Sequence, residues 1–361
     1  ALTDYNAMWR WSIDDLEGFW NAIWDFFDVR ASVRPEKMLV KRQMPDMEWG
    51  TGGRLNYAEN ILKHVAGRED DLALIVQSET FGRSEMTWGQ LCAQVASVAK
   101  HLRDMGVKEG DRVVAILPNT ETALIALLAT ASIGAVWSLC APDMGHVAIL
   151  DRFKQIAPKV LIAQDGYMHG GNQVDRRAVL AQINAELPSV VQFVTFAVVG
   201  PLPKGHVDWR DLTQDDVPFE ANQVAFEHPL WIVYSSGTTG NPKPIVHGHG
   251  GIILEAAKQS LHHDISASDR FSWLTSSGWI MWNAQWMALG QGACVALFDG
   301  APNHPDMGVL WRFVANEKLT YFGAGAAFFS SCMKAGLTPR DDVDLTAIRS
   351  LGSTGSPLSG D

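Results

Sequence analysis

The chain has 361 residues, of which 47% are hydrophobic and 19% charged, a balance typical of a globular protein with a large buried core. Its formal net charge of −11 argues against nucleic acid or an anionic membrane surface as a bulk partner. No apolar run approaches the roughly 18 residues that a membrane-spanning helix needs, so we expect no membrane span.

Residues 1–60 are expected to form an N-terminal helical extension. The segment LEGFWNAIWDFF spaces its large apolar side chains three and four residues apart, which is typical of an amphipathic helix. Gly50, Gly52 and Gly53 then interrupt the helical pattern before a short helix resumes.

From about residue 72, strand-like and helix-like segments alternate. The strand-like segments LALIVQ, DRVVAIL, AVWSLC and KVLIA are apolar throughout, and segments with helical spacing separate them. One of these helices is predicted to begin at Pro142. Apolar strands alternating with helices predict an α/β fold whose mostly parallel sheets carry helices on both faces.

The alternation predicts two similar α/β subdomains, one over residues 61–220 and one over residues 221–361. The polar stretch 201–220 is the best linker candidate. After it the pattern restarts with WIVYSS, a helix over about 251–262, FSWLT and ACVALF.

The cysteines indicate a reduced, cytoplasmic protein. They lie far apart among apolar neighbours, without the C-x-x-C spacing of many metal and redox sites. They are Cys92, Cys140, Cys294 and Cys332.

The stretch YSSGTTGNPKPIVHGHGG follows an apolar strand and predicts a phosphate-binding loop. Glycines let backbone N–H groups approach phosphate oxygens, hydroxyls donate further hydrogen bonds, and the lysine supplies a mobile cation. The predicted ligands are Ser235, Ser236, Gly237, Thr238, Thr239, Gly240 and Lys243. The alternative is a turn rich in serine, threonine and glycine that binds nothing.

This loop is not a Walker loop. A Walker loop opens directly into a helix after its lysine, whereas Pro242 and Pro244 flank Lys243 here. The same context, together with the absence of other kinase signatures, disfavours a kinase-like phosphotransferase.

The SSGTTG–x-P-K arrangement resembles the signature loop of the adenylate-forming superfamily, which includes acyl-CoA synthetases, luciferases and peptide-synthetase adenylation domains. The resemblance implies that the loop grips the β- and γ-phosphates of ATP while a carboxylate attacks the α-phosphorus. An acyl-adenylate and pyrophosphate then form, and coenzyme A displaces AMP. The implied cofactors and co-substrates are ATP, Mg²⁺ and coenzyme A.

Two further segments support the resemblance. LGSTGSPLSGD is similar to the adenine-binding turn of that family, which implies adenine contacts at Gly355, Ser356 and Pro357. FSWLTSSGWIMWN is similar to the segment that walls the acyl pocket, and the residues implied there are Gly278, Trp279, Trp282 and Asn283, with His247 beside them. The alternative is that the tryptophans are core residues and that Asn283 caps or turns a helix.

Three further segments are most similar to the acetoacetate-activating (acetoacetate–CoA ligase) subfamily, namely WSIDDLEGFWNAIWDFFDV, GGRLNYAENIL and APDMGHVAILDRFKQIAPKVLI. This resemblance implies acetoacetate as the acid and a place in lipid and ketone-body metabolism, and we expect Asn283 to donate to its ketone. Acetate, propionate or butyrate remains the alternative within the class. A non-catalytic nucleotide-binding remnant is the alternative from another class.

We expect no metal site within the chain itself. His247 and His249 have no third or fourth ligand at useful spacing, and neither have His262 and His263. Mg²⁺ is expected to enter with ATP, because it binds partly through phosphates.

The resemblance places the catalytic lysine and a small C-terminal domain beyond Asp361. We therefore expect the chain to be most of the large N-terminal domain of a longer enzyme, and to be poorly active or inactive alone.

Overall fold

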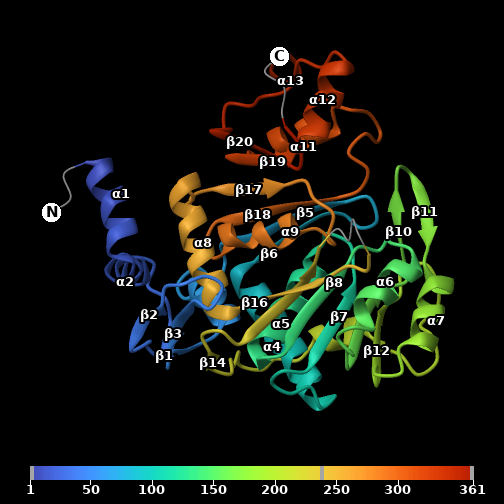
Figure 1. The fold of residues 1–361 in the computed structure, drawn as a ribbon. Coiled ribbons are helices and arrows are strands. Elements are labelled where there is room, and N and C mark those ends of the chain that lie inside the picture. The colour runs from blue at the N-terminus through green and yellow to red at the C-terminus, as the bar shows by residue number, and fades with distance from the viewer. Residues whose placement is uncertain (1–3, 236–239, 358–361) are drawn as a thin grey trace.

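The computed structural model of the protein describes residues 4–235 and 240–357. Two large sheets with helices between and outside them form most of the fold (Figure 1). Most neighbouring strands within the sheets run parallel, so the expected α/β class is confirmed.

The first large sheet has seven strands within the described residues. In spatial order they are β13 (Val207–Asp208), β12 (Gln192–Phe196), β9 (Val160–Gln164), β7 (Arg112–Ile116), β8 (Val136–Cys140), β15 (Pro229–Tyr234) and β16 (Pro244–Gly248). All neighbours pair in parallel except β15 and β16, which form an antiparallel pair at one edge.

The second large sheet has six strands within the same described ranges. Its order is β20 (Ser350–Thr354), β19 (Tyr321–Gly325), β17 (Arg270–Trp273), β18 (Cys294–Asp299), β5 (Leu72–Ser78) and β6 (Gly82–Thr87). Only β5 and β6 pair antiparallel.

The two sheets exchange strands across the expected subdomain boundary near residue 220. Strands β5 and β6 precede that boundary but belong to the six-stranded sheet, and β15 and β16 follow it but belong to the seven-stranded sheet. The division between the sheets therefore does not coincide with a single cut in the sequence.

The helices of the central part cover these sheets. They are α4 (Trp88–Asp104), α5 (Glu121–Ile133), α6 (His146–Phe153), α7 (Arg177–Glu186), α8 (His249–His263), α9 (Ile280–Ala284) and α10 (Trp286–Leu289). Every residue of α5 from Thr122 to Ile133 is buried, which explains why its sequence is apolar all round. Helix α4 begins with a capping box in which the Thr87 and Gln90 side chains each accept from the other residue's backbone N–H.

The N-terminal extension is helical only in its first half. Helices α1 (Tyr5–Asp14) and α2 (Leu16–Phe26) are capped by the carboxylates of Asp4 and Asp15. Four short strands follow, namely β1 (Ala31–Val33), β2 (Lys37–Lys41), β3 (Glu48–Thr51) and β4 (Arg54–Leu55), before α3 (Tyr57–Leu62). The helical expectation is wrong over these strands, which are too short to show a period in sequence and which pair only with each other and with β14 (Val224–Ala225).

Two other expectations also need correction. The helix predicted to begin at Pro142 begins at His146, because Ala141 to Met144 form a turn closed by a backbone hydrogen bond of 3.2 Å. The stretch 201–220 is only partly a linker, since β13 and a 3₁₀ helix over Trp209–Thr213 lie in it and bury Trp209 and Leu212.

The remaining elements lie at the periphery. A hairpin of β10 (Gly166–His169) and β11 (Asn172–Asp175) projects from the seven-stranded sheet, and a 3₁₀ turn over Lys63–Val65 follows α3. Helices α11 (Val309–Asn316), α12 (Ala326–Lys334) and α13 (Pro339–Asp342) flank β19 and β20 (Figure 1).

Glycines let the last strands of the six-stranded sheet pass under a tryptophan. The Trp273 indole lies over Gly323 of β19 and Gly352 of β20, where an added Cβ would come within 2.1 and 2.5 Å of the ring. This close packing fixes β20 and therefore the turn that follows it.

Candidate functional site

The carboxyl ends of strands from both sheets border one crevice of about 380 Å³, which we call the strand-end crevice. Asn119 follows β7, Asp143 follows β8, Thr275 follows β17, and Asp299 and Gly300 lie at the end of β18. Ligands of open α/β sheets bind at the carboxyl ends of strands, so this crevice is a candidate site.

The predicted adenine turn lies beside Trp279, which lines the strand-end crevice. Gly355 follows β20 with a φ of 90°, a conformation that favours glycine, and an added Cβ would lie 3.6 Å from the Trp279 ring. Ser356 and Pro357 follow and are exposed. The fold therefore brings together two segments that lie more than seventy residues apart in sequence.

The two ends of the predicted phosphate loop are joined by hydrogen bonds. The Ser235 backbone N–H donates to the Lys243 carbonyl and the Lys243 N–H donates to Ser235 Oγ, each at 3.1 Å. Gly240 has a φ of 154°, and the Lys243 side chain is exposed. The other predicted ligands, Ser236, Gly237, Thr238 and Thr239, lie outside the described residues.

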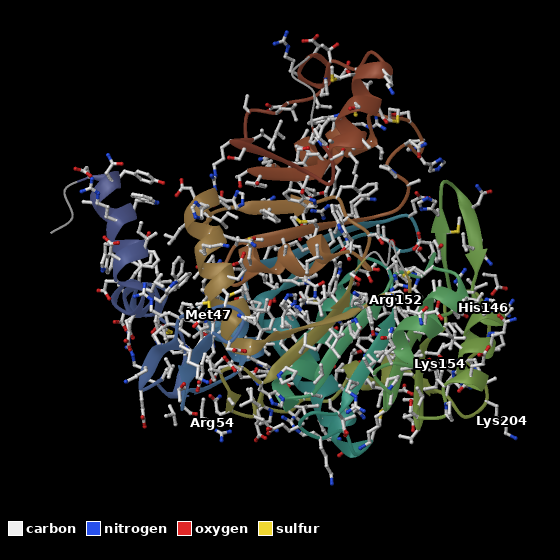
Figure 2. The ribbon with its side chains drawn as sticks, viewed as in Figure 1. Met47, Arg54, His146, Arg152, Lys154 and Lys204 are labelled. Atoms are coloured by element: carbon white, nitrogen blue, oxygen red, sulfur yellow. The ribbon has the colours of Figure 1, made fainter. Side chains whose placement is uncertain are left out.

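A strand, β16, follows Lys243, so the prediction that this is not a Walker loop is confirmed. Helix α6 and the residues directly after it support both arms of the loop. The Tyr234 hydroxyl donates to the Arg152 carbonyl at 3.0 Å, and Gln155 Nε2 donates to the Pro242 carbonyl at 2.9 Å. Figure 2 shows Arg152 nearer the middle of the molecule than Lys154, which directly follows α6. The Arg152 guanidinium lies 5.6 Å from the Tyr234 ring centroid.

A second cavity of about 460 Å³ lies between α8, α9 and the β15–β16 pair, and we call it the α8 cavity. Apolar side chains such as Ile252, Ile280 and Met287 form much of its lining. Its polar lining includes His247 and Asn283, so the structure brings these two predicted residues into one cavity.

Three polar groups in the α8 cavity have no hydrogen-bond partner among the described residues. They are the Tyr57 hydroxyl, His247 Nε2 and the Asn283 carboxamide. By contrast, Glu255 in the same lining accepts from Gln259 and pairs with Lys258. A largely apolar cavity with a few polar groups free to bind a ligand is typical of a small-molecule site, so the α8 cavity is a candidate ligand site.

The remaining acyl-pocket residues lie elsewhere. Trp282 is fully buried and packs edge-on against Trp286 at 5.2 Å between centroids, so it is a core residue and does not line the α8 cavity. A Cβ on Gly278 would lie 3.1 Å from the Ala141 nitrogen, so this glycine permits close packing beside the crevice.

Two carboxyls near the strand-end crevice were not predicted from sequence. Burial raises the pKa of Asp299 to about 6, although Ser78 Oγ donates to its carboxylate at 2.7 Å. Burial also raises the pKa of Glu121 at the start of α5. Aspartate at the end of an apolar strand is common, so the sequence carried little signal of this burial.

Tyr57 and Trp231 of the α8 cavity were also missed. Tyr57 comes from the N-terminal segment, and Trp231 meets His247 only through the β15–β16 register. Spacing along the sequence cannot reveal either contact.

Among residues 4–235 and 240–357, no group of three or more histidine, cysteine, aspartate or glutamate side chains is arranged to hold a metal ion. His249 is instead a buried structural residue. Its Nδ1 accepts from the Tyr57 N–H at 3.1 Å, and burial lowers its pKa to about 3. Within the described ranges, no helix is long and apolar enough to cross a membrane.

Comparisons with known proteins match the chain along nearly its full length. Residues 62–361 match a family model described as AMP-binding enzyme, and residues 5–61 match one described as acetyl-coenzyme A synthetase N-terminus. An acetoacetyl-CoA synthetase from Rhizobium meliloti is 38% identical over 371 residues, which cover 99% of this chain and 56% of that protein. A malonamoyl-CoA synthetase from Penicillium aethiopicum is 31% identical over 392 residues, covering 99% of this chain and 54% of that protein.

A solved structure has the same fold. The acetoacetyl-CoA synthetase from Streptomyces lividans superposes with a TM-score of 0.96 at 45% identity, covering 99% of this chain and 55% of that one. The chain thus spans about half the length of the relatives that it matches.

Proposed function

Because the chain belongs to the AMP-binding enzyme family, we propose that it forms the nucleotide and acyl sites of an ATP-dependent acid–thiol ligase. Its acid is acetoacetate, and the products are acetoacetyl-CoA, AMP and pyrophosphate. The relatives that share the whole length of this chain include acetoacetyl-CoA synthetases, which supports this choice.

The observation that carries the proposal is the α8 cavity, which is largely apolar but offers three unpartnered polar groups. Acetoacetate and malonamate, the acids implied by the names of two relatives, both carry a carbonyl at the third carbon. A short acid with a carbonyl at that position would use the apolar wall for its chain and the polar groups for its oxygen. Asn283, with its free carboxamide, is one donor.

The proposed reaction has two steps. A carboxylate oxygen of acetoacetate attacks the α-phosphorus of ATP, the bond between the α-phosphorus and the bridging oxygen breaks, and pyrophosphate leaves. The coenzyme A sulfur then attacks the acyl carbon, AMP leaves, and the thiol proton is released.

The positions of the predicted residues support the first step. Lys243 directly precedes β16 and His247 lies on it four residues later, a span of about 13 Å for extended chain. The loop would hold the outer phosphates while the acid lies in the α8 cavity, and Gly355 to Pro357 would contact adenine. Mg²⁺ would enter with the phosphates, since it keeps waters and needs few protein ligands.

Butyrate is the second candidate acid, favoured by the apolar wall of the α8 cavity. We place the protein in the cytoplasm because all four cysteines, which lie within the described residues, are free thiols.

The test is product formation by the natural full-length protein with ATP, Mg²⁺ and coenzyme A. Acetoacetate, butyrate, 3-hydroxybutyrate and acetate are supplied separately, and AMP and the CoA ester are measured by mass spectrometry. We expect acetoacetate to give the highest kcat/KM. A higher kcat/KM with another acid would contradict acetoacetate as the substrate. No CoA ester with any acid would favour a non-catalytic nucleotide-binding remnant.

A further inference from the structure

We propose that His247 donates a hydrogen bond from Nε2 to the third-carbon carbonyl of the acid, and that Trp231 fixes the ring in the tautomer that can donate. The proposal rests on the proposed function, because it assigns the residue that distinguishes a 3-oxo acid from a simple short acid.

The tautomer follows from the chemistry of the two rings. Trp231 Nε1 lies 2.9 Å from His247 Nδ1, and an indole nitrogen can only donate. Nδ1 must therefore be the acceptor. A neutral imidazole that accepts at Nδ1 carries its proton on Nε2.

The Trp231 contact is unusual among the tryptophans of this core. The indole N–H groups of five other tryptophans, all within the described residues, are buried without a partner. They are Trp88, Trp137, Trp273, Trp282 and Trp286. The one indole directed at a histidine is thus not explained by a general need to satisfy buried N–H groups.

The Nε2 nitrogen of His247 is available to a ligand in the α8 cavity. His247 lines the α8 cavity, and among the described residues nothing accepts from its Nε2. The opposite edge of the ring is held by β15, through the register that pairs Trp231 with His247. The ring is therefore oriented by the sheet and offers one donor to the cavity.

The neutral ring is also the stable one here. Protonation of Nδ1 would set two donors against each other at the Trp231 contact. Burial lowers the pKa of His247, which acts in the same direction, whereas Glu255 opposes it. A neutral donor suits a ketone oxygen, because a charged group would attract the carboxylate of the acid instead.

A fixed donor gives discrimination as well as binding. Acetoacetate accepts the hydrogen bond, whereas butyrate places a methylene against a buried N–H and leaves it unpaired. Sites built to hydrogen-bond one polar group of a substrate discriminate against analogues that lack it.

The experiment compares kcat/KM of acid-dependent ATP–pyrophosphate exchange for acetoacetate and butyrate in the natural full-length protein. The variants are His247→Phe, which keeps the ring but removes both hydrogen bonds, and His247→Gln, which restores a donor. His262→Phe is the matched control, because His262 is exposed and outside both cavities.

We expect His247→Phe to lower the ratio of acetoacetate to butyrate kcat/KM by roughly tenfold or more. His247→Gln should recover part of that loss, and His262→Phe should leave the ratio unchanged. An equal fall for both acids, or an unchanged ratio in His247→Phe, would overturn the role of His247. If the wild-type protein shows no preference for acetoacetate over butyrate, the proposed function is contradicted, and this inference with it.

Trp231→Phe tests the positioning role separately. We expect a fall in the ratio of roughly two- to fivefold, with a change of the His247 ring from the Nε2–H tautomer to a mixture in ¹⁵N NMR of histidine-labelled protein. The His247→Gln variant identifies the resonance. An unchanged tautomer with an unchanged ratio would show that Trp231 does not set the donor, and the Trp231 variant remains informative if His247→Phe fails to fold.

Discussion

Asn283 offers a carboxamide to the α8 cavity with only 8% of the residue exposed. Among the described residues the carboxamide has no partner, so its hydrogen bonds are available to a bound acid. It shares this property with His247 in the same cavity, and a carbonyl oxygen has two lone pairs to accept from both.

We therefore expect Asn283→Ala to weaken acetoacetate turnover by about 0.5–1.5 kcal/mol, or roughly two- to tenfold in kcat/KM. Butyrate, which offers no acceptor at the third carbon, should lose less. Initial-rate measurements with both acids check this. An equal loss for the two acids would mean that Asn283 supports the fold of α9 and does not contact the ketone.

Asp299 makes stability depend on pH. Its pKa in the folded chain, about 6, lies above its ordinary value of 3.8, so the stability that its protonation supports is present below about pH 4. That stability is lost as the pH rises through about 6. The full effect corresponds to about 3 kcal/mol.

Asp299→Asn should thus stabilise the protein more at pH 7.5 than at pH 4.5, by about 2 kcal/mol. Thermal unfolding at both pH values measures the difference. Asp143→Asn, at an exposed residue of the same crevice, is the control. A gain from Asp299→Asn that is equal at the two pH values would show that the carboxyl is not held protonated by burial.

At the scale of single residues, the sequence suggests site residues only where they belong to a local motif. Ser235, Lys243 and Gly355 lie in such motifs. Ser235 and Gly355 directly follow β15 and β20, and Lys243 directly precedes β16. The sequence left Trp282 open between pocket and core, because a tryptophan in an apolar segment looks the same whether it lines a cavity or fills the core. Tyr57 was missed because its contact with the α8 cavity depends on long-range packing.

At the scale of elements, one ion pair ties β20 to the rest of the six-stranded sheet. Arg349, just before β20, donates to Asp269 Oδ1 at 3.0 Å and also donates to the Asp264 carbonyl. Asp269 is buried, and burial alone would raise the pKa of its carboxyl. The hydrogen bonds that it accepts from Arg349, Thr320 and Ser266 outweigh burial, so the pKa of Asp269 is lowered.

Arg349→Leu should destabilise the protein by about 2–4 kcal/mol, because it leaves the Asp269 carboxylate buried with too few partners. Arg340→Leu is the matched control. Its pair with Asp341 spans 3.7 Å with both side chains exposed, so we expect a change of about 0.5 kcal/mol or less. Denaturant unfolding measures the free energy of unfolding of both variants. Equal losses of stability in the two would contradict a special role for Arg349.

Elements were predicted well where hydrophobicity alone defines them. The buried strands of both sheets and helices α4 and α5 follow directly from continuous or periodic apolar residues. The strands between α2 and α3 were not predicted, since they have two to five residues and are stabilised by pairing with distant strands.

At the scale of the whole molecule, the exchange of strands between the sheets explains why the site draws on distant segments. Strands β7 and β8 of one sheet and β17 and β18 of the other end at the same crevice. The fold class was predictable from the alternation of elements, but which strand joins which sheet was not, because strand order depends on packing that leaves no local pattern.

The most direct test of the account is acid-dependent ATP–pyrophosphate exchange in the absence of coenzyme A, measured on the natural full-length protein. Exchange isolates the first step, for which this chain is proposed to supply the phosphate loop, the adenine turn and the acyl cavity. We predict exchange that depends on acetoacetate and that falls when Lys243 is replaced by alanine. No exchange with any acid, or exchange indifferent to the acid supplied, would contradict the account.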